Sequence, residues 1–219
     1  MLEYISDGGS GGGDRTPILK FSAKDGSFIA VERVQIDGQW TNQDNELTPP
    51  IKVAMDLEKL EVGYIAFMPA PDFRMVLVGE RPPEKPSDVG ADGKPMHKWG
   101  FRVQLTNKDI GLRELSSSSK NVYVAMQTLY AQYVAGKDEN VGKVPIVEIS
   151  GTERKVQTLS DGQQQTWRVP QWAVVGWTDR PAALGGVAAS PAEPAAASVA
   201  PPVAADPPTA ATAGSDLFV

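Results

Sequence analysis

The sequence predicts a mainly β domain with one α-helix, followed by a tail rich in alanine and proline. Three observations predict this. Short runs of β-branched and aromatic residues alternate with turn residues over most of the chain. A single long stretch, 120–135, repeats apolar residues at helical spacing. Beyond Arg180 the chain has no Lys or Arg and consists mostly of alanine, proline and small residues.

These patterns divide the chain of 219 residues into three parts. Residues 1–16 are expected to be a flexible leader, because 8–13 read Gly-Gly-Ser-Gly-Gly-Gly. A P-loop is excluded there, since no Lys-Ser/Thr pair follows the glycines. Residues 17–180 form the predicted domain. Residues 181–219 are predicted to be disordered, because they offer little apolar surface to offset the entropy of ordering.

The first half of the domain reads as short strands. Alternation predicts strands at 18–21 and 27–36, the second ended by Asp37-Gly38. An irregular polar stretch then runs to Pro49-Pro50. Residues 62–68 and 73–78 flank a Pro-Ala-Pro-Asp turn and are expected to form a hairpin.

Residues 80–96, rich in proline and glycine, predict a long mobile loop of the kind that often carries function. A clear alternating strand follows at 97–105. Serines 116–119 offer N-caps for the helix at 120–135, and Gly136 is its expected end. Strands are predicted again at 144–149, 154–159 and 166–175.

Several strands, one helix and then more strands is the order of an OB-like Greek-key barrel, in which a helix lies between the third and fourth strands. We therefore expect that fold, with the helix at about 120–135. A β-sandwich with one added helix is the alternative.

Composition limits the function. The net charge is -6, and residues 1–180 hold 24 of the 27 acids against all 21 bases, or -3. A uniformly basic nucleic-acid binder is therefore excluded, and any such site must be a local patch. The chain has no cysteine, no secretory signal pattern and no apolar stretch long enough to cross a membrane. We expect a cytoplasmic protein, in the host cytoplasm if a phage encodes it, and no membrane partner.

Catalysis is not expected, and neither are cofactors or metals. The single histidine, His97, is read as a surface or edge residue, and no Gly-x-Ser-x-Gly motif is present. A zinc site would need several His or Cys ligands. Asp56, Glu58 and Glu61 remain a candidate magnesium cluster, although a solvated turn or short helix is the favoured interpretation.

Binding of single-stranded nucleic acid needs a basic groove and aromatic faces for stacking. Residues 94–102 combine both, because Lys98 and Arg102 alternate with Trp99 and Phe101 around Gly100. The alternative is that the aromatic pair is core and the cations are a solvated face. Further candidates are basic or aromatic residues elsewhere in the domain: Trp40, Arg74, Arg113, Lys120, Arg154, Lys155 and Arg168.

The chain ends in an apolar peptide with one acid, Asp216-Leu217-Phe218-Val219. A tether with such an end is typical of a recognition peptide. A barrel-like domain, an Ala/Pro/Gly tail and this tip resemble bacterial and phage single-stranded-DNA-binding proteins. The resemblance implies that the tip recruits replication or recombination enzymes. Asp216-Leu217-Phe218 also resembles the end of sliding-clamp-binding peptides, which makes the clamp a candidate partner.

The first hypothesis is thus a non-enzymatic single-stranded-DNA-binding protein of phage or bacterial replication or recombination, able to form homo-oligomers. The alternative is a virion structural or assembly protein with a β domain and a flexible tail. An affinity module for a protein or sugar is a third class.

Overall fold

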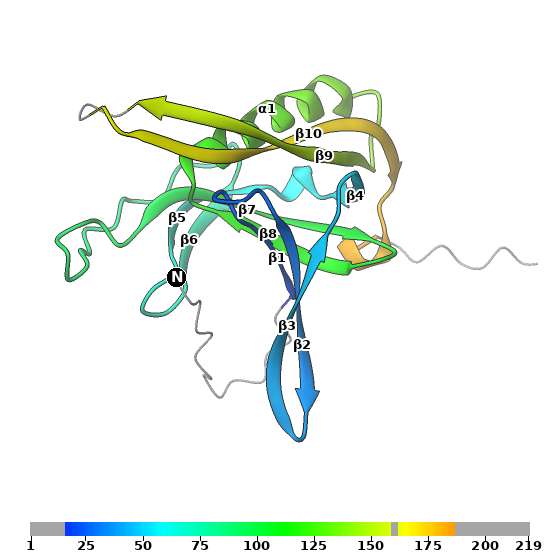
Figure 1. Ribbon diagram of the computed structural model, residues 1–219. Helices are drawn as coiled ribbons and strands as arrows, with labels where there is room; N and C mark the ends of the chain where they lie inside the picture. Colours follow the sequence, from blue (N-terminus) through cyan, green and yellow to red (C-terminus); the bar gives the residue numbers. More distant parts are fainter. Residues whose placement is uncertain (1–15, 159–161, 187–219) are drawn as a thin grey trace, which may run out of the picture. The chain divides into compact units, whose positions relative to one another are not determined.

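The strands and helices are those of a computed structural model that describes residues 16–158 and 162–186. Within these residues, ten strands form one mixed sheet and a single α-helix is present (Figure 1). The first strands are β1 (Ile18–Phe21), β2 (Phe28–Ile36), β3 (Gln39–Leu47), β4 (Ile51–Met55), β5 (Glu61–Ala66) and β6 (Asp72–Leu77). The later elements are β7 (Lys98–Asn107), β8 (Gly111–Ser117), α1 (Lys120–Lys137), β9 (Lys143–Thr158) and β10 (Gln164–Asp179).

The sheet follows the order β10-β9-β4-β7-β8-β1-β2-β3, and β5 lies off this path, pairing with β6 and β7. All pairs are antiparallel except β1 with β8. Strands β4 and β5 both pair with β7, and the short 3-10 helix η1 (Leu57–Lys59) lies between them in the chain. One long strand, β7, therefore aligns two short ones.

One hydrogen bond links distant parts of the sheet path. The backbone N–H of Arg168 in β10 donates to the carbonyl of Ala23, directly after β1, at 2.7 Å. The turn between β1 and β2 thus contacts β10, although β1 and β10 are far apart in the strand order. This contact fixes the position of the β9–β10 hairpin relative to β1.

The core lies between the sheet and α1. The helix buries Val122, Met126, Leu129 and Tyr133, which recur at three- and four-residue spacing. The Trp172 side chain of β10 packs there and donates its indole N–H to the carbonyl of Ala125 at 3.0 Å. The sheet contributes fully buried residues from several strands, including Phe28, Met55, Phe101, Leu105, Leu115 and Ile149.

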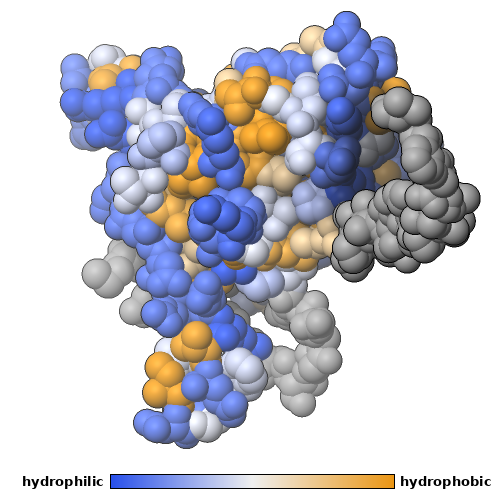
Figure 2. Space-filling model, turned by 90° about the vertical axis from the view of Figure 1, so that its right-hand side faces the viewer, coloured by the Kyte–Doolittle hydropathy of each residue, from blue (hydrophilic) through white to orange (hydrophobic). Residues whose placement is uncertain are grey.

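Two long hairpins project from this body on different sides (Figure 1). The β2–β3 hairpin pairs nine residues on each strand without a break, from Phe28 opposite Leu47 to Ile36 opposite Gln39. The β9–β10 hairpin extends on another side, together with the segment between β6 and β7. Figure 2 shows the β2–β3 hairpin as the lower projection, with hydrophobic residues exposed among hydrophilic ones.

The mainly β prediction with one helix is confirmed, but several elements differ. Residues 39–47, expected to be irregular, form β3, because cross-strand pairing with β2 supplies the backbone hydrogen bonds that this polar sequence does not favour by itself. Strand β4 was missed, and serines 116 and 117 belong to β8 rather than to a loop. The helix continues past Gly136 to Lys137.

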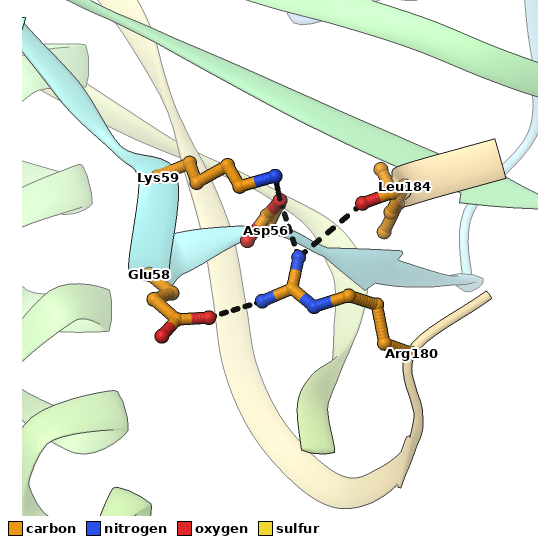
Figure 3. A network of polar contacts seen from close by, with 5 residues as sticks. All are labelled: Asp56, Glu58, Lys59, Arg180 and Leu184. Carbon is orange, nitrogen blue, oxygen red and sulfur yellow. Dashed lines mark hydrogen bonds and ion pairs between the residues drawn. The ribbon is translucent and has the colours of Figure 1, made fainter. Parts of the chain in front are cut away.

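The interpretation of Asp56, Glu58 and Glu61 as a solvated turn is wrong for Asp56, whose side chain is only 1 % exposed. Its carboxylate accepts a hydrogen bond from the Arg180 guanidinium at 2.6 Å, and Arg180 also pairs with Glu58 (Figure 3). The same guanidinium donates to the carbonyl of Leu184 at 3.4 Å. Buried charge requires such a partner, because desolvation of an unpaired carboxylate is costly.

The packed chain extends past the boundary placed at residue 180. A second 3-10 helix, η2 (Ala182–Leu184), follows Arg180, and the Leu184 side chain is buried. Gly185 ends this turn with φ of 79°, a backbone conformation that favours glycine. Residues 1–15 of the leader and the tail from 187 onward lie outside the described residues.

Truncation tests this boundary. A chain stopped after Arg180 should lose about 2–5 kcal/mol of unfolding free energy relative to a chain stopped after Ala188, because the buried Leu184 side chain is removed. Urea unfolding measures both. Leu184→Ala in the full chain should reproduce most of the loss, and equal stability of the two truncated chains would contradict the packing of this segment.

Candidate nucleic-acid interface

The outer part of the β9–β10 hairpin, residues 151–158 and 162–171, concentrates basic side chains and is called the basic arm below. Arg154 lies directly opposite Arg168 in the strand register, and Lys155 lies opposite Trp167. Because successive side chains of a strand alternate between faces, the two arginines share one face and Lys155 and Trp167 share the other.

The arginines of this arm have no acidic partner. Among the described residues neither Arg154 nor Arg168 forms an ion pair, and Arg154 makes only a 3.5 Å contact with the hydroxyl of Thr166. Lys155, by contrast, pairs with Glu153. A guanidinium without a carboxylate keeps its planar set of donors available for a phosphate. The arginine face is therefore the stronger anion-binding side of the arm.

The turn between β1 and β2 brings a further cation to this face. A Cβ on Gly26 would lie 2.7 Å from Thr152 Oγ1 and 3.1 Å from Arg168 Cγ, so the turn packs directly against Thr152 and Arg168. Lys24, exposed in this turn, was missed by the sequence analysis, which read Lys24-Asp25-Gly26 only as a turn. The backbone N–H and hydroxyl of Ser27 donate to Asp25 and lower its pKa to about 2.

Helix α1 forms a groove with the other face of the arm. Its volume is about 390 Å³, and we call it the α1–arm groove; its lining residues are Asn121, Val124, Ala125, Lys155, Val156, Trp167 and Val169. Lys120 begins the helix beside Asn121, and no acid lies in the first turn. Lys120 forms no ion pair within the part of the chain that the structure describes. The groove thus has apolar walls and a basic rim.

Lys98 stands at the start of β7, exposed and without an ion pair among the described residues. Trp99 beside it is half-buried and meets the Tyr64 ring edge-on, with centroids 5.0 Å apart. Gly100 is not an open gap, because a Cβ there would lie 2.3 Å from the carbonyl oxygen of Ser117. The glycine instead permits close approach of β7 and β8.

Two of the aromatic candidates, Phe101 and Trp40, do not form a binding surface together with Lys98. Phe101 is 0 % exposed and belongs to the core, so its ring cannot stack on a base, and we remove it from the interface. Its side of β7 faces the interior because β7 is covered on that side by the other core strands. Trp40 is 59 % exposed but lies on the β2–β3 hairpin, where the Arg33 guanidinium is 5.3 Å from its ring.

Three candidate arginines are held by acids. Arg74 pairs with Asp72 at 3.3 Å and with Asp88 at 3.5 Å. Arg102 and Arg113 are bound as well: Arg102 donates to Glu61 at 2.5 Å, and the buried Arg113 pairs with Glu32 at 2.9 Å. Binding a phosphate would require each of them to leave a carboxylate. In the structure these three arginines therefore stabilise the fold, and their guanidinium groups are not free to bind a phosphate.

His97 is buried rather than at the surface, which corrects the expectation for the single histidine. Its Nε2 lies 2.9 Å from Asp72 Oδ2, and this hydrogen bond, followed by the contribution of Arg74, lowers the pKa of Asp72. The pair links the end of the 78–97 segment to β6. Sequence reasoning could not see the pair, because its partners are distant in the chain.

Glu114 lies in a second pocket beside the Arg102–Glu61 pair. Burial is the main cause that raises the pKa of the Glu114 carboxyl, and Glu61 adds to it while Arg102 opposes it. The hydrogen bond with Glu61 raises the pKa of Arg102. Arg102 thus interacts favourably with the carboxylates of both Glu61 and Glu114.

Some predictions remain outside what the structure describes or find no match in it. The candidate docking residues Asp216, Leu217, Phe218 and Val219 lie outside the described residues. In the described ranges, no three His, Cys, Asp or Glu residues gather in a way that could hold a metal ion. Nor does any helix there have the length and apolar character to cross a membrane.

Comparison of the chain with protein-family models, with curated proteins and with solved structures finds no match.

The half-buried carboxyl of Glu114 gives a pH-dependent prediction. Because its pKa is raised on folding, the stability associated with it is greatest at low pH and declines as pH rises above the ordinary glutamate range. Glu114→Gln should therefore raise the free energy of unfolding at pH 8 and change it little at pH 4. Urea unfolding at both pH values checks this, with the exposed Glu84→Gln as control. A gain of equal size at both pH values would contradict the assignment.

Proposed function

We propose that this protein binds single-stranded DNA through its basic arm and catalyses no reaction. The observation that carries the proposal is the pair Arg154 and Arg168, opposite each other and without ion pairs within the described residues, with Lys24 on the adjoining turn. In a domain that is close to neutral overall, unpaired cations gathered on one projection form a local site for a polyanion.

We also infer an OB-like barrel. In this reading β4 and β5 together form the first strand, β7 and β8 the second and third, and β9 and β10 the fourth and fifth. Three facts support it: the broken first strand pairs with both β7 and β9, α1 follows β8, and Arg168 bonds to Ala23 next to β1. One departure is that β1, parallel to β8, stands where a direct contact between the third and fifth strands would lie.

This reading supports the same binding surface. OB folds bind oligonucleotides on the face of strands two and three and on two loops, the one between strands one and two and the one between strands four and five. The corresponding segments are 67–97 and the outer part of the β9–β10 hairpin, and the described residues of both lie on one side in Figure 1. Lys98 ends the first segment and Arg154 and Arg168 belong to the second hairpin. A single strand would thus contact both.

The chemistry favours contact with the phosphate backbone. Trp99 and Trp167 are half-buried, which leaves only part of each ring for stacking. Lys24, Lys98 and Arg154, in contrast, are exposed, and Arg168 is half-buried. Binding of this kind is weakly dependent on sequence and strongly dependent on salt. Recruitment of replication or recombination proteins, with a sliding clamp as one candidate, belongs to the same proposal and would use residues 216–219.

The alternative, a virion assembly protein, is favoured by one different observation. The β2–β3 hairpin projects from the body and exposes Ile36 and Trp40, which suits contact with a protein better than contact with a nucleic acid. An assembly protein would self-associate and would show no salt-dependent binding to DNA.

The test is fluorescence anisotropy of labelled oligo-dT with the full chain at several salt concentrations. The double variant Arg154→Gln/Arg168→Gln should bind at least tenfold more weakly at low salt. Its log–log salt slope should be shallower by about 0.7 for each phosphate that the variant no longer neutralises. Lys108→Gln is the matched control, because it removes an exposed cation from the turn between β7 and β8.

A chain stopped after Ala188 separates the domain from the tail. Retained binding by this chain would place the activity in the described domain. Absence of binding by the full chain even at low salt would overturn the proposal. An equal weakening of binding in the Lys108→Gln control and the double variant would show that only net charge matters and would remove the arm as the site.

A further inference from the structure

We propose that the protein associates head to tail, with the tip of the β2–β3 hairpin of one copy inserted into the α1–arm groove of the next. This inference concerns contact between protein chains and does not depend on nucleic-acid binding. It joins two features of the described residues that the proposed function leaves unused: an exposed apolar tip and an apolar groove.

The projecting hairpin exposes more than a surface strand normally does. Beyond Glu32, side chains on its two strands are exposed or half-buried, and β3 is the end strand of the sheet path. Ile36 and Trp40 near the tip are 56 % and 59 % exposed. Isolated two-stranded hairpins are only marginally stable in water, and bare end strands invite pairing. A partner that covers this tip would stabilise the hairpin and would shield the outer part of the end strand from unwanted pairing.

The hairpin is suited to insertion because its turn is tight and each of its faces carries one large apolar side chain near the tip. Asp37 and Gly38 both have positive φ, 51° and 81°, as a tight two-residue hairpin turn requires. Register places Trp40 opposite Gln35 and Ile36 opposite Gln39, so the two large side chains lie on opposite faces. A preordered tip loses little conformational entropy on docking.

The α1–arm groove offers two apolar walls to such a tip. Val124 and Ala125 of the helix lie on one side, and Val156, Trp167 and Val169 of the arm lie on the other. Val124 and Val156 are each half exposed. Its volume of about 390 Å³ has room for large side chains. A tip with Ile36 on one face and Trp40 on the other would contact both walls.

The charges of the tip and the groove are compatible with a second copy as the occupant. Asp37 at the tip and Lys120 at the groove rim each lack an ion pair in the described part of the chain, and Lys155 also lines the groove. Insertion would bring Asp37 next to these ammonium groups. Phosphates of single-stranded DNA would meet the same ammonium groups, so it is the exposed Ile36 and Trp40 side chains, which match the apolar walls, that favour a second copy as the occupant. The β2–β3 hairpin lies on a different side of the body from α1 and the β9–β10 hairpin, which form the groove (Figure 1). The contact therefore joins two different surfaces, and such a heterologous contact repeats from copy to copy.

Cross-linking tests the contact directly, because the chain has no cysteine of its own. Full-length Gln39→Cys at the tip and full-length Asn121→Cys at the groove are mixed without nucleic acid and treated with a short bismaleimide. The expected product is a dimer whose cross-linked peptide joins positions 39 and 121. Replacing the second variant by Lys108→Cys should abolish it. Equal yield with Lys108→Cys, or a product that joins only tip to tip, would overturn the proposal.

Sedimentation velocity gives an independent measurement. The wild-type chain should form larger species as its concentration rises, and Trp40→Ala should move this transition to at least about tenfold higher concentration, as loss of a buried aromatic anchor does. Val141→Ala, at an 85 % exposed site between α1 and β9, is the control. A wild-type chain that stays monomeric at every concentration would overturn the proposal, even if it binds oligo-dT. Protection of position 121 from maleimide by oligo-dT, without any 39–121 product, would assign the groove to nucleic acid instead.

Discussion

The ion pair between Asp56 and Arg180 is the constraint on which the rest of the fold depends. Asp56 is buried next to η1, where the chain separates β4 from β5, and Arg180 directly follows β10. The pair therefore connects the break in the strand that runs along β7 to the end of the last hairpin. One oxygen, Asp56 Oδ1, has no hydrogen-bond partner among the described residues, whereas Oδ2 accepts from Arg180 at 2.6 Å and lies 3.9 Å from the Lys59 ammonium group (Figure 3). Breaking a buried pair by removing one partner typically costs about 3–5 kcal/mol, because an uncompensated charge is left behind.

Ion pairing also decides which cations are available for a ligand. Arg74, Arg102 and Arg113 satisfy carboxylates that would otherwise be unpaired in or near the body. Four other cations form no ion pair within the described residues: Lys98, Lys120, Arg154 and Arg168. The two arginines lie on the same face of the β9–β10 hairpin. A near-neutral domain can thus present a basic surface without an excess of bases, since half of the acids in the described residues are already paired with other cations.

The two projecting hairpins have opposite chemistry. The β9–β10 hairpin carries unpaired arginines and is fixed to the body by the Arg168–Ala23 hydrogen bond. The β2–β3 hairpin carries apolar side chains at its tip, and its base is held by the pair of Glu32 with Arg113. The two proposed contacts share the β9–β10 hairpin but use opposite faces of it, because the arginines lie on one face and the α1–arm groove lies against the other. If both occur, a row of copies along one strand would follow from the heterologous geometry.

The sequence by itself determined the elements whose signal is local. Apolar spacing identified the helix through Val122, Met126 and Leu129, alternation identified most strands, and Asp37-Gly38 identified the end of β2. It also identified Arg154, Lys155 and Arg168 as basic residues on strands. Only the tertiary structure decided which side chains are buried or paired. Phe101 is buried in the core, His97 is hydrogen-bonded to Asp72, and Arg180 pairs with Asp56, 124 residues away in the chain. The physical reason is that helix and turn preferences act between neighbours, whereas burial and ion pairing depend on strands that meet only after the chain has folded.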